Sequence, residues 1–522
     1  MALVVAGQIS PLDPANPDAS FAGRVYLAED GTVAAVKKAG QSEPNGFAET
    51  RRVDVGDAFV YPGLIDLHSH LGYASLPLWT EDTQETPFLH HDRWPDAKSY
   101  KAKVTWPSYL VAAGAPEALL VYAQVRALVG GTTAIQGWPT RNRNPLNQLI
   151  RSVDDEDLGT GSSNLFRTST LTLGDGELIE RAGYLAAGEG FIYHCAEGQV
   201  GSLVTREFDD AAMTNCLRSK LVAIHLTAVG DEAFRRWDER ARLAGDPGPG
   251  TVVWSPFSNL WLYGQTTDVA AARRHGVTVA IGTDWGPSGT KNLLGELKVA
   301  QLWSEHAGLG LTTFDLAQMV TSAPGDTLSR CWPSPAGRLV AGGLGDLCVI
   351  EAREDDPWDN LVAARDEDVQ LVIVGGIARY GTKTLMDRSG VTATTSVNIG
   401  NGNLRRVALV DPADPTARWY WSRVIDKIEQ VRRDPAGAMA RGLTAMVAMA
   451  GRPLTDITHD DPLIVELDMP GPGGVRAGPP PDPASVDVPA APSLRHDRPW
   501  RADIKGRAFH GGVLDGLDRF YT

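Results

Sequence analysis

Several motifs of common enzyme classes are absent from this chain of 522 residues. It has no Gly-Lys dipeptide, no Gly-x-Ser-x-Gly and no His-Glu-x-x-His, which excludes a phosphate-binding loop, a serine nucleophile elbow and a zincin helix. The four cysteines lie far apart and form no Cys-x-x-Cys pair, which argues against a thiolate zinc site or a disulfide framework. We predict that they are small buried side chains.

Basic charge and long apolar runs are also scarce. The chain has 49 Lys and Arg against 64 Asp and Glu, a formal net charge of -15, which disfavours nucleic acid or an anionic membrane as a partner, because both bind clustered basic residues. No apolar run is long enough to cross a bilayer, and the first residues lack a basic signal-peptide start. We therefore expect a cytoplasmic homo-oligomer, a dimer or larger, that acts on a small molecule without membrane or nucleic-acid partners.

The order of apolar runs predicts an α/β fold with three regions. Short Val- and Ala-rich runs separated by turns predict an antiparallel β unit, a composite β-sandwich made of residues 1–61 plus 336–385. Between them, apolar strands alternate with helical stretches over residues 62–335, which predicts a parallel sheet of a length that suits a (β/α)₈ TIM barrel. Residues 386–522 form a C-terminal extension with a Pro/Gly-rich linker at 470–492.

An insertion interrupts the predicted barrel at residues 71–109. It is rich in tryptophan and proline, and it is too long and irregular for a simple connection between a strand and a helix. Such loops are typically lids or binding loops, and the alternative is a packed excursion held by its own tryptophans.

Histidines and one carboxylate stand at the ends of predicted strands. His68 and His70 follow an apolar run and lie two positions apart, so on a strand both imidazoles point the same way. His194, His225 and Asp284 follow three later apolar runs, and in a barrel the carboxyl ends of the strands share one face. These nitrogen and oxygen donors predict a site for one divalent metal ion, with zinc preferred and Fe(II) or Mn as alternatives.

An open metal site implies catalysis. A bound cation would lower the pKa of its water and make hydroxide available as a nucleophile without a Ser or Cys. Glu197 stands three residues after His194, close enough to carry a proton from that water to a leaving nitrogen.

The ordered pattern resembles the amidohydrolase superfamily, in its mononuclear metal-dependent branch with the cytosine and guanine deaminases, the triazine hydrolases and imidazolonepropionase. The pattern itself reads His68-x-His70, His194-x-x-Glu197, His225 and Gly282-Thr-Asp284. Flanking motifs extend the resemblance over residues 3–381: Tyr61-Pro-Gly-Leu-Ile-Asp-Leu-His-Ser-His for the first strand, Gly131-Thr-Thr for the second, Ser255-Pro-Phe-Ser-Asn-Leu for the seventh, and Gly337-Arg-Leu, Gly345-Asp-Leu and Gly375-Gly for the accessory β-sandwich.

The resemblance implies a role for each motif residue. The implied metal ligands are His68, His70, His194 and Asp284; Asp284 also accepts a proton from the water, His225 orients the water or polarises the attacked group, and Glu197 is the proton shuttle. The family's two-metal members use a carboxylated lysine, but this chain has no lysine between Lys103 and Lys220, so a mononuclear site is expected. A glutamate such as Glu177 or Glu180 could still bridge a second metal.

The substrate is less constrained, because the insertion and the C-terminal extension have no counterpart in the family pattern. Aromatic and polar residues near predicted strand ends are candidates for substrate contact, chiefly Trp79, Trp138, Asn259 and Trp285, with Trp254, Trp261, Tyr263 and Ser258 also nearby. The favoured reaction is hydrolysis of a non-peptide C–N bond by deamination of an amino-substituted N-heterocycle. The alternatives are hydrolysis of an amide or cyclic amide without ammonia release, and a non-catalytic binding protein on the same fold.

Overall fold

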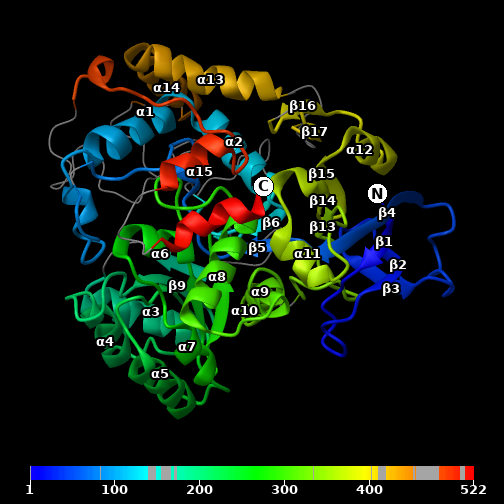
Figure 1. The fold of residues 1–522 in the computed structure, drawn as a ribbon, viewed down its shortest axis with the longest axis horizontal. Coiled ribbons are helices and arrows are strands. Elements are labelled where there is room, and N and C mark those ends of the chain that lie inside the picture. Colours follow the sequence, from blue (N-terminus) through cyan, green and yellow to red (C-terminus); the bar gives the residue numbers. More distant parts are fainter. Residues whose placement is uncertain are drawn as a thin grey trace.

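The structure is a computed structural model, shown in Figure 1. It describes residues 2–82, 84–138, 149–154, 166–169, 173–332, 334–400, 402–409, 419–450, 453, 481–505 and 512–521. Part of the predicted linker, residues 470–480, lies outside these described residues.

Strands from two distant parts of the chain form one nine-stranded sheet, on the right of Figure 1. In spatial order it contains β16 (Thr395–Asn398), β17 (Leu404–Val407), β15 (Ile377–Gly381), β14 (Val369–Val374), β13 (Leu347–Ile350), β4 (Arg51–Pro62), β1 (Leu3–Ile9), β2 (Phe21–Leu27) and β3 (Val33–Lys38). The expectation of a purely antiparallel unit is wrong at one point, because β1 pairs with β4 in parallel. Residues 39–50 run back along the sheet before β4 begins, which gives β4 the direction of β1.

The predicted parallel strands form two further sheets. One contains β5 (Leu64–Asp66), β6 (Thr132–Ile135) and β7 (Arg151–Ser152), and the other contains β8 (Phe166–Ser169), β9 (Gly190–Cys195), β10 (Leu221–His225), β11 (Thr251–Trp254) and β12 (Thr278–Ile281). A parallel backbone bridge between Ser69 and Asp284 joins the chain just beyond β5 to the chain just beyond β12. This bridge holds the C-terminal ends of β5 and β12 next to each other.

Helices alternate with these strands and cover them, as Figure 1 shows for α3, α4, α5 and α7. Their bounds are α2 (Pro116–Val129), α3 (Asp175–Ala187), α4 (Thr205–Met213), α5 (Asp231–Leu243), α6 (Pro256–Tyr263), α7 (Val269–Arg274), α8 (Leu293–Ala307), α9 (Thr313–Met319) and α10 (Ser322–Ser329). Strands such as β6, β10 and β11 are buried along their whole length, as expected for parallel strands covered on both faces.

The first predicted strand divides between two sheets at Gly63. β4 ends at Pro62 in the nine-stranded sheet and β5 begins at Leu64 in the parallel sheet, so His68 and His70 lie beyond the end of β5. A Cβ on Gly63 would come within 2.1 Å of the Thr133 Oγ1 atom, so the chain crosses between sheets where only glycine fits. The motif beginning at Ser255 is also mainly helical, because β11 ends at Trp254 and α6 starts at Pro256, a favoured first helical residue.

The insertion packs through its aromatic side chains. It contains the short helices η1 (Leu71–Tyr73), η2 (Trp94–Asp96) and η3 (Lys101–Thr105) and leads into α1 (Trp106–Gly114). Trp79 stacks on Phe88 and meets Tyr100 edge to face, while Trp94 contacts Trp285 just after β12. The insertion therefore covers the strand ends with its own aromatic cluster.

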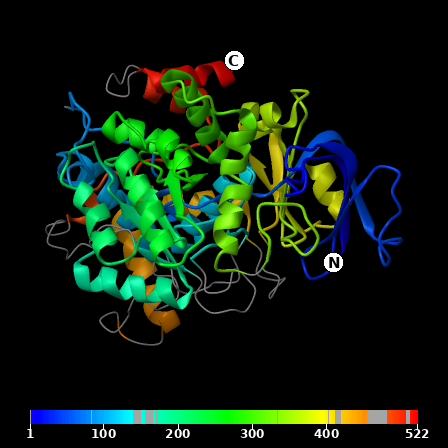
Figure 2. The ribbon, with the colours of Figure 1, turned by 90° about the horizontal axis from the view of Figure 1, so that it is seen from below.

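The C-terminal part wraps around the strands and helices described above. The helices α13 (Trp421–Arg433) and α14 (Pro435–Ala450) lie beside α1 and α2 (Figure 1), and η9 (Val513–Phe520) packs on α8. α15 (Arg498–Ile504) brings Trp500 onto the ring of Phe257 in α6, and the His496 Nδ1 atom lies 3.0 Å from an Asp366 carboxylate oxygen. Figure 2 shows this segment, in red, against the green helices.

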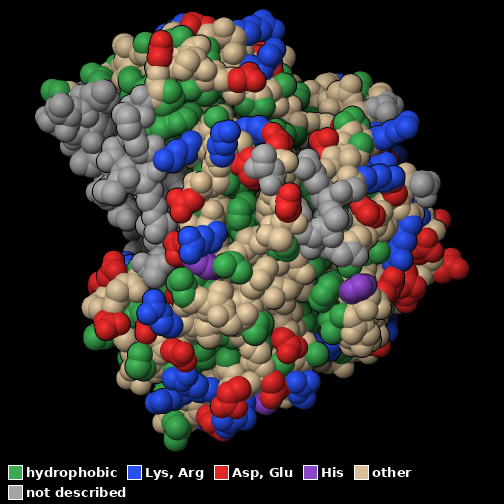
Figure 3. Space-filling view, turned by 60° about the vertical axis from the view of Figure 1, so that its left-hand side comes forward, with side chains coloured by type: hydrophobic (Ala, Val, Ile, Leu, Met, Phe, Trp, Pro, Cys, Tyr) green, Lys and Arg blue, Asp and Glu red, His purple; other side chains and the backbone are tan. Residues whose placement is uncertain are grey.

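The described helices include none with the length and apolar character needed to span a bilayer. On the face in Figure 3, basic and acidic side chains are interspersed. Among the described residues many charged side chains pair, such as Arg519 with Glu305 and Arg235 with Glu232.

Candidate active site

Three histidines and one aspartate converge beyond the ends of the parallel strands. The His68 Nε2 atom lies 3.1 Å from His70 Nε2 and 3.0 Å from His194 Nε2, and the His70 and His194 Nε2 atoms are 3.4 Å apart. The Asp284 Oδ1 atom is 3.4 Å from both His68 Nε2 and His70 Nε2. The backbone N–H of Asp284 donates to the His68 carbonyl oxygen at 2.9 Å, which fixes the aspartate against the first strand.

The hydrogen bonds around this cluster leave nitrogen lone pairs pointing inward. The Ser169 carbonyl oxygen lies 3.3 Å from His194 Nδ1, so this nitrogen carries the proton and Nε2 offers a lone pair. Burial and the neighbouring histidines hold the pKa of His68 well below its ordinary value, so its imidazole is neutral. Converging lone pairs and a carboxylate repel one another unless a cation lies between them.

A divalent metal ion fits this donor set. Ligands about 2.0–2.1 Å from a tetrahedral zinc lie roughly 3.3 Å from each other, which matches the five donor–donor distances given above. Neutral imidazoles with one carboxylate are ligands that divalent metals take readily in proteins. Among the described residues, the clusters able to hold a metal all fall here: His68, His70 and His194, and His68, His225 and Asp284.

A directional chain of hydrogen bonds sets the tautomer of His225. The Trp254 indole N–H donates to Thr266 Oγ1 at 2.6 Å, so the Thr266 hydroxyl must donate onward to Asn259 Oδ1 at 3.1 Å. The Asn259 amide N–H₂ group then faces His225 Nδ1 at 3.0 Å and donates to it. The proton of neutral His225 is therefore on Nε2, which lies 3.7 Å from Glu197 Oε2 and 4.0 Å from Asp284 Oδ2.

Glu197 is buried next to His225. Its Oε1 atom accepts a hydrogen bond from the Tyr263 hydroxyl at 2.6 Å. Burial raises the pKa of Glu197 to about 7, the charge of Asp284 adds to the rise, and nearby His91 opposes it. A carboxyl group with such a pKa can both accept and release a proton near neutral pH.

Unusual backbone angles cluster at the strand ends that carry these residues. Ala196, His225, Leu226 and Asp284 all have positive φ, between 48° and 71°. Non-glycine residues rarely adopt this conformation, and such strain concentrates at functional sites. At Gly137 the backbone passes so close to Ser69 that a Cβ would lie 1.6 Å from the Ser69 carbonyl oxygen.

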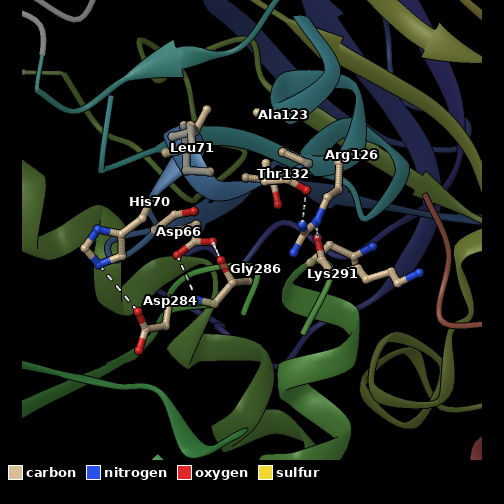
Figure 4. Close-up of a pocket in the computed structure, with 15 residues that line it drawn as sticks. Asp66, His70, Leu71, Ala123, Arg126, Thr132, Asp284, Gly286 and Lys291 are labelled. Atoms are coloured by element: carbon tan, nitrogen blue, oxygen red, sulfur yellow. Dashed lines mark hydrogen bonds and ion pairs between the residues drawn. The ribbon is translucent and has the colours of Figure 1, made fainter. Parts of the chain in front are cut away.

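A small polar cavity of about 20 Å³ backs the cluster behind His70 and Asp284 (Figure 4). It has room for about one water molecule. The Arg126 guanidinium lies at its edge and donates to the carbonyl oxygens of Ala74, Thr290 and Lys291, at 2.7–2.9 Å. Arg126 thus ties together the segments that follow His70 and Asp284.

The predicted substrate contacts divide into two groups. Trp285 follows Asp284 directly and packs between Tyr73 and Trp94, so it lies beside the cluster, whereas half-buried Trp138 is placed only by its position shortly after β6. Trp79 is 4% exposed and its indole donates to Ser99, which places it in the packing of the insertion. Asn259 is fully buried on His225 and supports that histidine.

The suggestion of a glutamate bridge to a second metal is wrong for both named residues. Glu177 and Glu180 are exposed on α3, where Glu177 accepts from the Gly174 N–H and Glu180 from the Tyr184 hydroxyl. Sequence reasoning also missed Arg126, because an arginine inside a predicted amphipathic helix carries no sign that its side chain turns inward.

Known proteins resemble the chain over most of its length, although no protein-family profile matches it. It is 26% identical over 382 residues to a 5-methylthioadenosine/S-adenosylhomocysteine deaminase of Moorella thermoacetica, covering 66% of this chain and 87% of the relative. A protein of the same name from Syntrophobacter fumaroxidans is 25% identical, covering 72% and 91%.

Solved structures share the fold. A zinc-bound adenosine deaminase from Xanthomonas campestris superimposes with a TM-score of 0.53 at 17% identity, covering 72% of this chain and 92% of that one. The guanine deaminase of E. coli gives 0.55 at 15% identity, covering 72% and 99%. These likenesses in sequence and fold agree with the resemblance to the amidohydrolase superfamily drawn from the motifs.

Proposed function

We propose that this protein is a metal-dependent deaminase that hydrolyses the exocyclic C–N bond of an amino-substituted N-heterocycle of the aminopurine kind. The observation that carries the proposal is a donor set of three histidines and Asp284 with buried Glu197 beside it. The relatives named as deaminases of 5-methylthioadenosine and S-adenosylhomocysteine support an aminopurine ring as the reacting group.

We assign His68, His70, His194 and Asp284 as the ligands of one divalent ion. Zinc is preferred over Fe(II) or Mn, because imidazole-rich sites with one carboxylate suit it and a zinc-bound adenosine deaminase shares the fold. When bound, such an ion activates water as a nucleophile and polarises the group under attack.

The remaining steps fall to the protein's own residues. Deamination adds water across the C–N bond and releases ammonia, so protons must move from the water to the leaving nitrogen. Asp284 accepts one proton, Glu197 delivers a proton to the nitrogen, and the His225 Nε2–H group donates to the atom that gains negative charge. The aromatic side chains of Trp138 and Trp285 are placed to stack on the ring.

We also propose how the three sheets are organised into a barrel and a second β unit. We infer that the two parallel sheets are parts of one (β/α)₈ barrel over residues 62–335, since a backbone bridge already links the chain beyond β5 to the chain beyond β12. We likewise infer that the nine-stranded sheet, which also includes β16 and β17, forms the composite β-sandwich expected of residues 1–61 plus 336–385.

The reaction can be tested directly by incubating zinc-loaded protein with a panel of compounds. The panel contains S-adenosylhomocysteine, 5-methylthioadenosine, adenosine, guanine, an aminotriazine and a cyclic amide. We expect ammonia release with replacement of one amino group by oxygen for at least one aminopurine, followed by mass spectrometry and an ammonia assay. Addition of water without ammonia would instead establish amide hydrolysis, and no turnover of any compound would contradict the proposal.

The metal content provides a second prediction. Because the two metal-binding clusters among the described residues share His68 and so lie at one place, we expect one divalent ion per chain by elemental analysis. Removal of the ion with a chelator is expected to abolish turnover, and one equivalent of zinc to restore it. Two tightly bound ions per chain would contradict the mononuclear assignment.

A further inference from the structure

The insertion reaches the site through a hydrogen-bonded chain that ends on Glu197. We infer that Tyr263 is a positioning residue for Glu197 and that Trp94 of the insertion holds Tyr263 in place. This inference rests on the proposed function, because it assigns a task toward the residue that moves the proton. It gives the tryptophan-rich insertion a role in the chemistry in addition to covering the strand ends.

The direction of every proton in this chain is fixed by the donors. The Trp94 indole N–H can only donate, and it lies 3.0 Å from the Tyr263 hydroxyl oxygen. The Tyr263 oxygen therefore accepts there, and its single proton is directed to Glu197 Oε1 at 2.6 Å. This distance is typical of a charge-assisted hydrogen bond to a carboxylate.

As a consequence, the two carboxylate oxygens of Glu197 have different partners. With Oε1 bound by Tyr263, the other oxygen, Oε2, is the one that faces His225 Nε2 at 3.7 Å. A carboxylate that rotated freely would present either oxygen, or neither, to the reacting atoms. Misplacement of a catalytic group by about 1 Å can cost about 100-fold in rate, so a fixed orientation has a measurable effect.

Tyr263 is well placed to hold this orientation. It is the last residue of α6, is 1% exposed, and is followed by Gly264 with a φ of +66°, so its ring is locked where the helix ends. The Gln199 side-chain N–H₂ group donates to the Tyr263 carbonyl oxygen at 3.2 Å, which ties the end of α6 to the loop that carries Glu197.

The insertion also forms hydrogen bonds with the backbone of the loop that carries Glu197. The His91 N–H donates to the Glu197 carbonyl oxygen at 3.1 Å, and the Gln199 N–H donates to the Leu89 carbonyl oxygen at 2.7 Å. At Gly198 a Cβ would lie 2.7 Å from the His90 Cβ, so the two segments are in close contact. The insertion therefore fixes both the main chain and, through Trp94 and Tyr263, the side chain of Glu197.

The decisive experiment is a double-mutant cycle in the full-length, zinc-loaded protein. We expect Tyr263→Phe to lower kcat by about 10- to 100-fold with KM changed by less than about threefold, because one hydrogen bond to a charged group is lost. In a Glu197→Gln background the same substitution should change kcat by less than about twofold. Equal losses in both backgrounds, or no loss in the wild-type background, would overturn the inference.

Trp94→Phe provides a second variant that leaves Tyr263 itself intact. It is expected to lower kcat by about 3- to 10-fold and to have no further effect once Tyr263 is phenylalanine. Tyr122→Phe is the matched control, because it removes a buried hydroxyl that donates to the Pro492 carbonyl oxygen and contacts none of these residues. A loss of kcat in the control equal to that in Tyr263→Phe would overturn the assignment.

Infrared spectroscopy tests the contact without any turnover. The difference spectrum between wild type and Glu197→Gln isolates the band of the Glu197 carboxyl group, and Tyr263→Phe should shift that band while Tyr122→Phe leaves it unchanged. An unshifted band in Tyr263→Phe would overturn the inference. If the proposed deamination is wrong, the wild-type protein will release no ammonia. The infrared measurement still tests the contact between Tyr263 and Glu197 in that case, because it does not depend on turnover.

Discussion

Replacement of Asp284 by asparagine is expected to lower kcat by about 1,000-fold or more in a protein that remains folded. In the proposed mechanism the Asp284 carboxylate is both a ligand with negative charge and the group that accepts a proton. Asparagine removes both properties, because a neutral amide binds a divalent metal weakly and cannot accept a proton at neutral pH. No other described carboxylate lies within the same metal-binding clusters to replace it.

The fold should survive this substitution for structural reasons. Asp284 has a φ of +60°, and asparagine is among the residues that tolerate this left-handed conformation best. The backbone bond from Asp284 N–H to the His68 carbonyl oxygen does not involve the side chain. The substitution therefore changes charge with little change in volume or backbone.

Three measurements on Asp284→Asn check this prediction: circular dichroism, metal content and kcat. A matched control is Asp246→Asn, which alters a carboxylate paired with Arg218 on the loop after α5 and should keep kcat within about twofold of wild type. If Asp284→Asn kept full metal content and a kcat within tenfold of wild type, Asp284 could not be the base.

The sequence was sufficient to predict which residues meet, because their positions follow from topology. His194, His225 and Asp284 are at or just beyond strand ends, and in a parallel sheet those ends face the same way, so order and spacing along the chain were enough. The predicted helix before Gly130 and the strands of the first sixty residues were recognisable from their hydrophobic periodicity.

The residues that hold those site residues in place could not be predicted in the same way. Tyr263 is 66 residues from Glu197 and 169 residues from Trp94, so their contacts depend on how α6 and the insertion approach each other. Asn259 was predicted as a substrate contact, and the fold instead turns its amide onto His225. Aromatic residues look alike in sequence whether their hydrogen bond lies within the insertion, as that of Trp79 to Ser99 does, or reaches a site residue, as that of Tyr263 to Glu197 does.

Replacement of Glu197 by glutamine is expected to lower kcat by about 100- to 10,000-fold while metal content stays at the wild-type level. Glutamine keeps the shape of the side chain, and its Oε1 atom can still accept the hydrogen bond from Tyr263. It cannot accept and release a proton near neutral pH, which the leaving nitrogen requires. Metal binding should be spared, because Glu197 belongs to neither of the metal-binding clusters among the described residues.

The design of this experiment separates proton transfer from metal binding. Metal content and kcat are measured for Glu197→Gln beside Glu180→Gln, a control on the exposed face of α3 that should change neither. A deaminase that depends on Glu197 for proton delivery should also lose less activity with a substrate whose leaving group is a better one than ammonia, such as a chloro-substituted ring, because that group needs no proton. Loss of the metal together with activity would show that Glu197 is a ligand, and an equal loss of rate with both leaving groups would show that it does not deliver the proton.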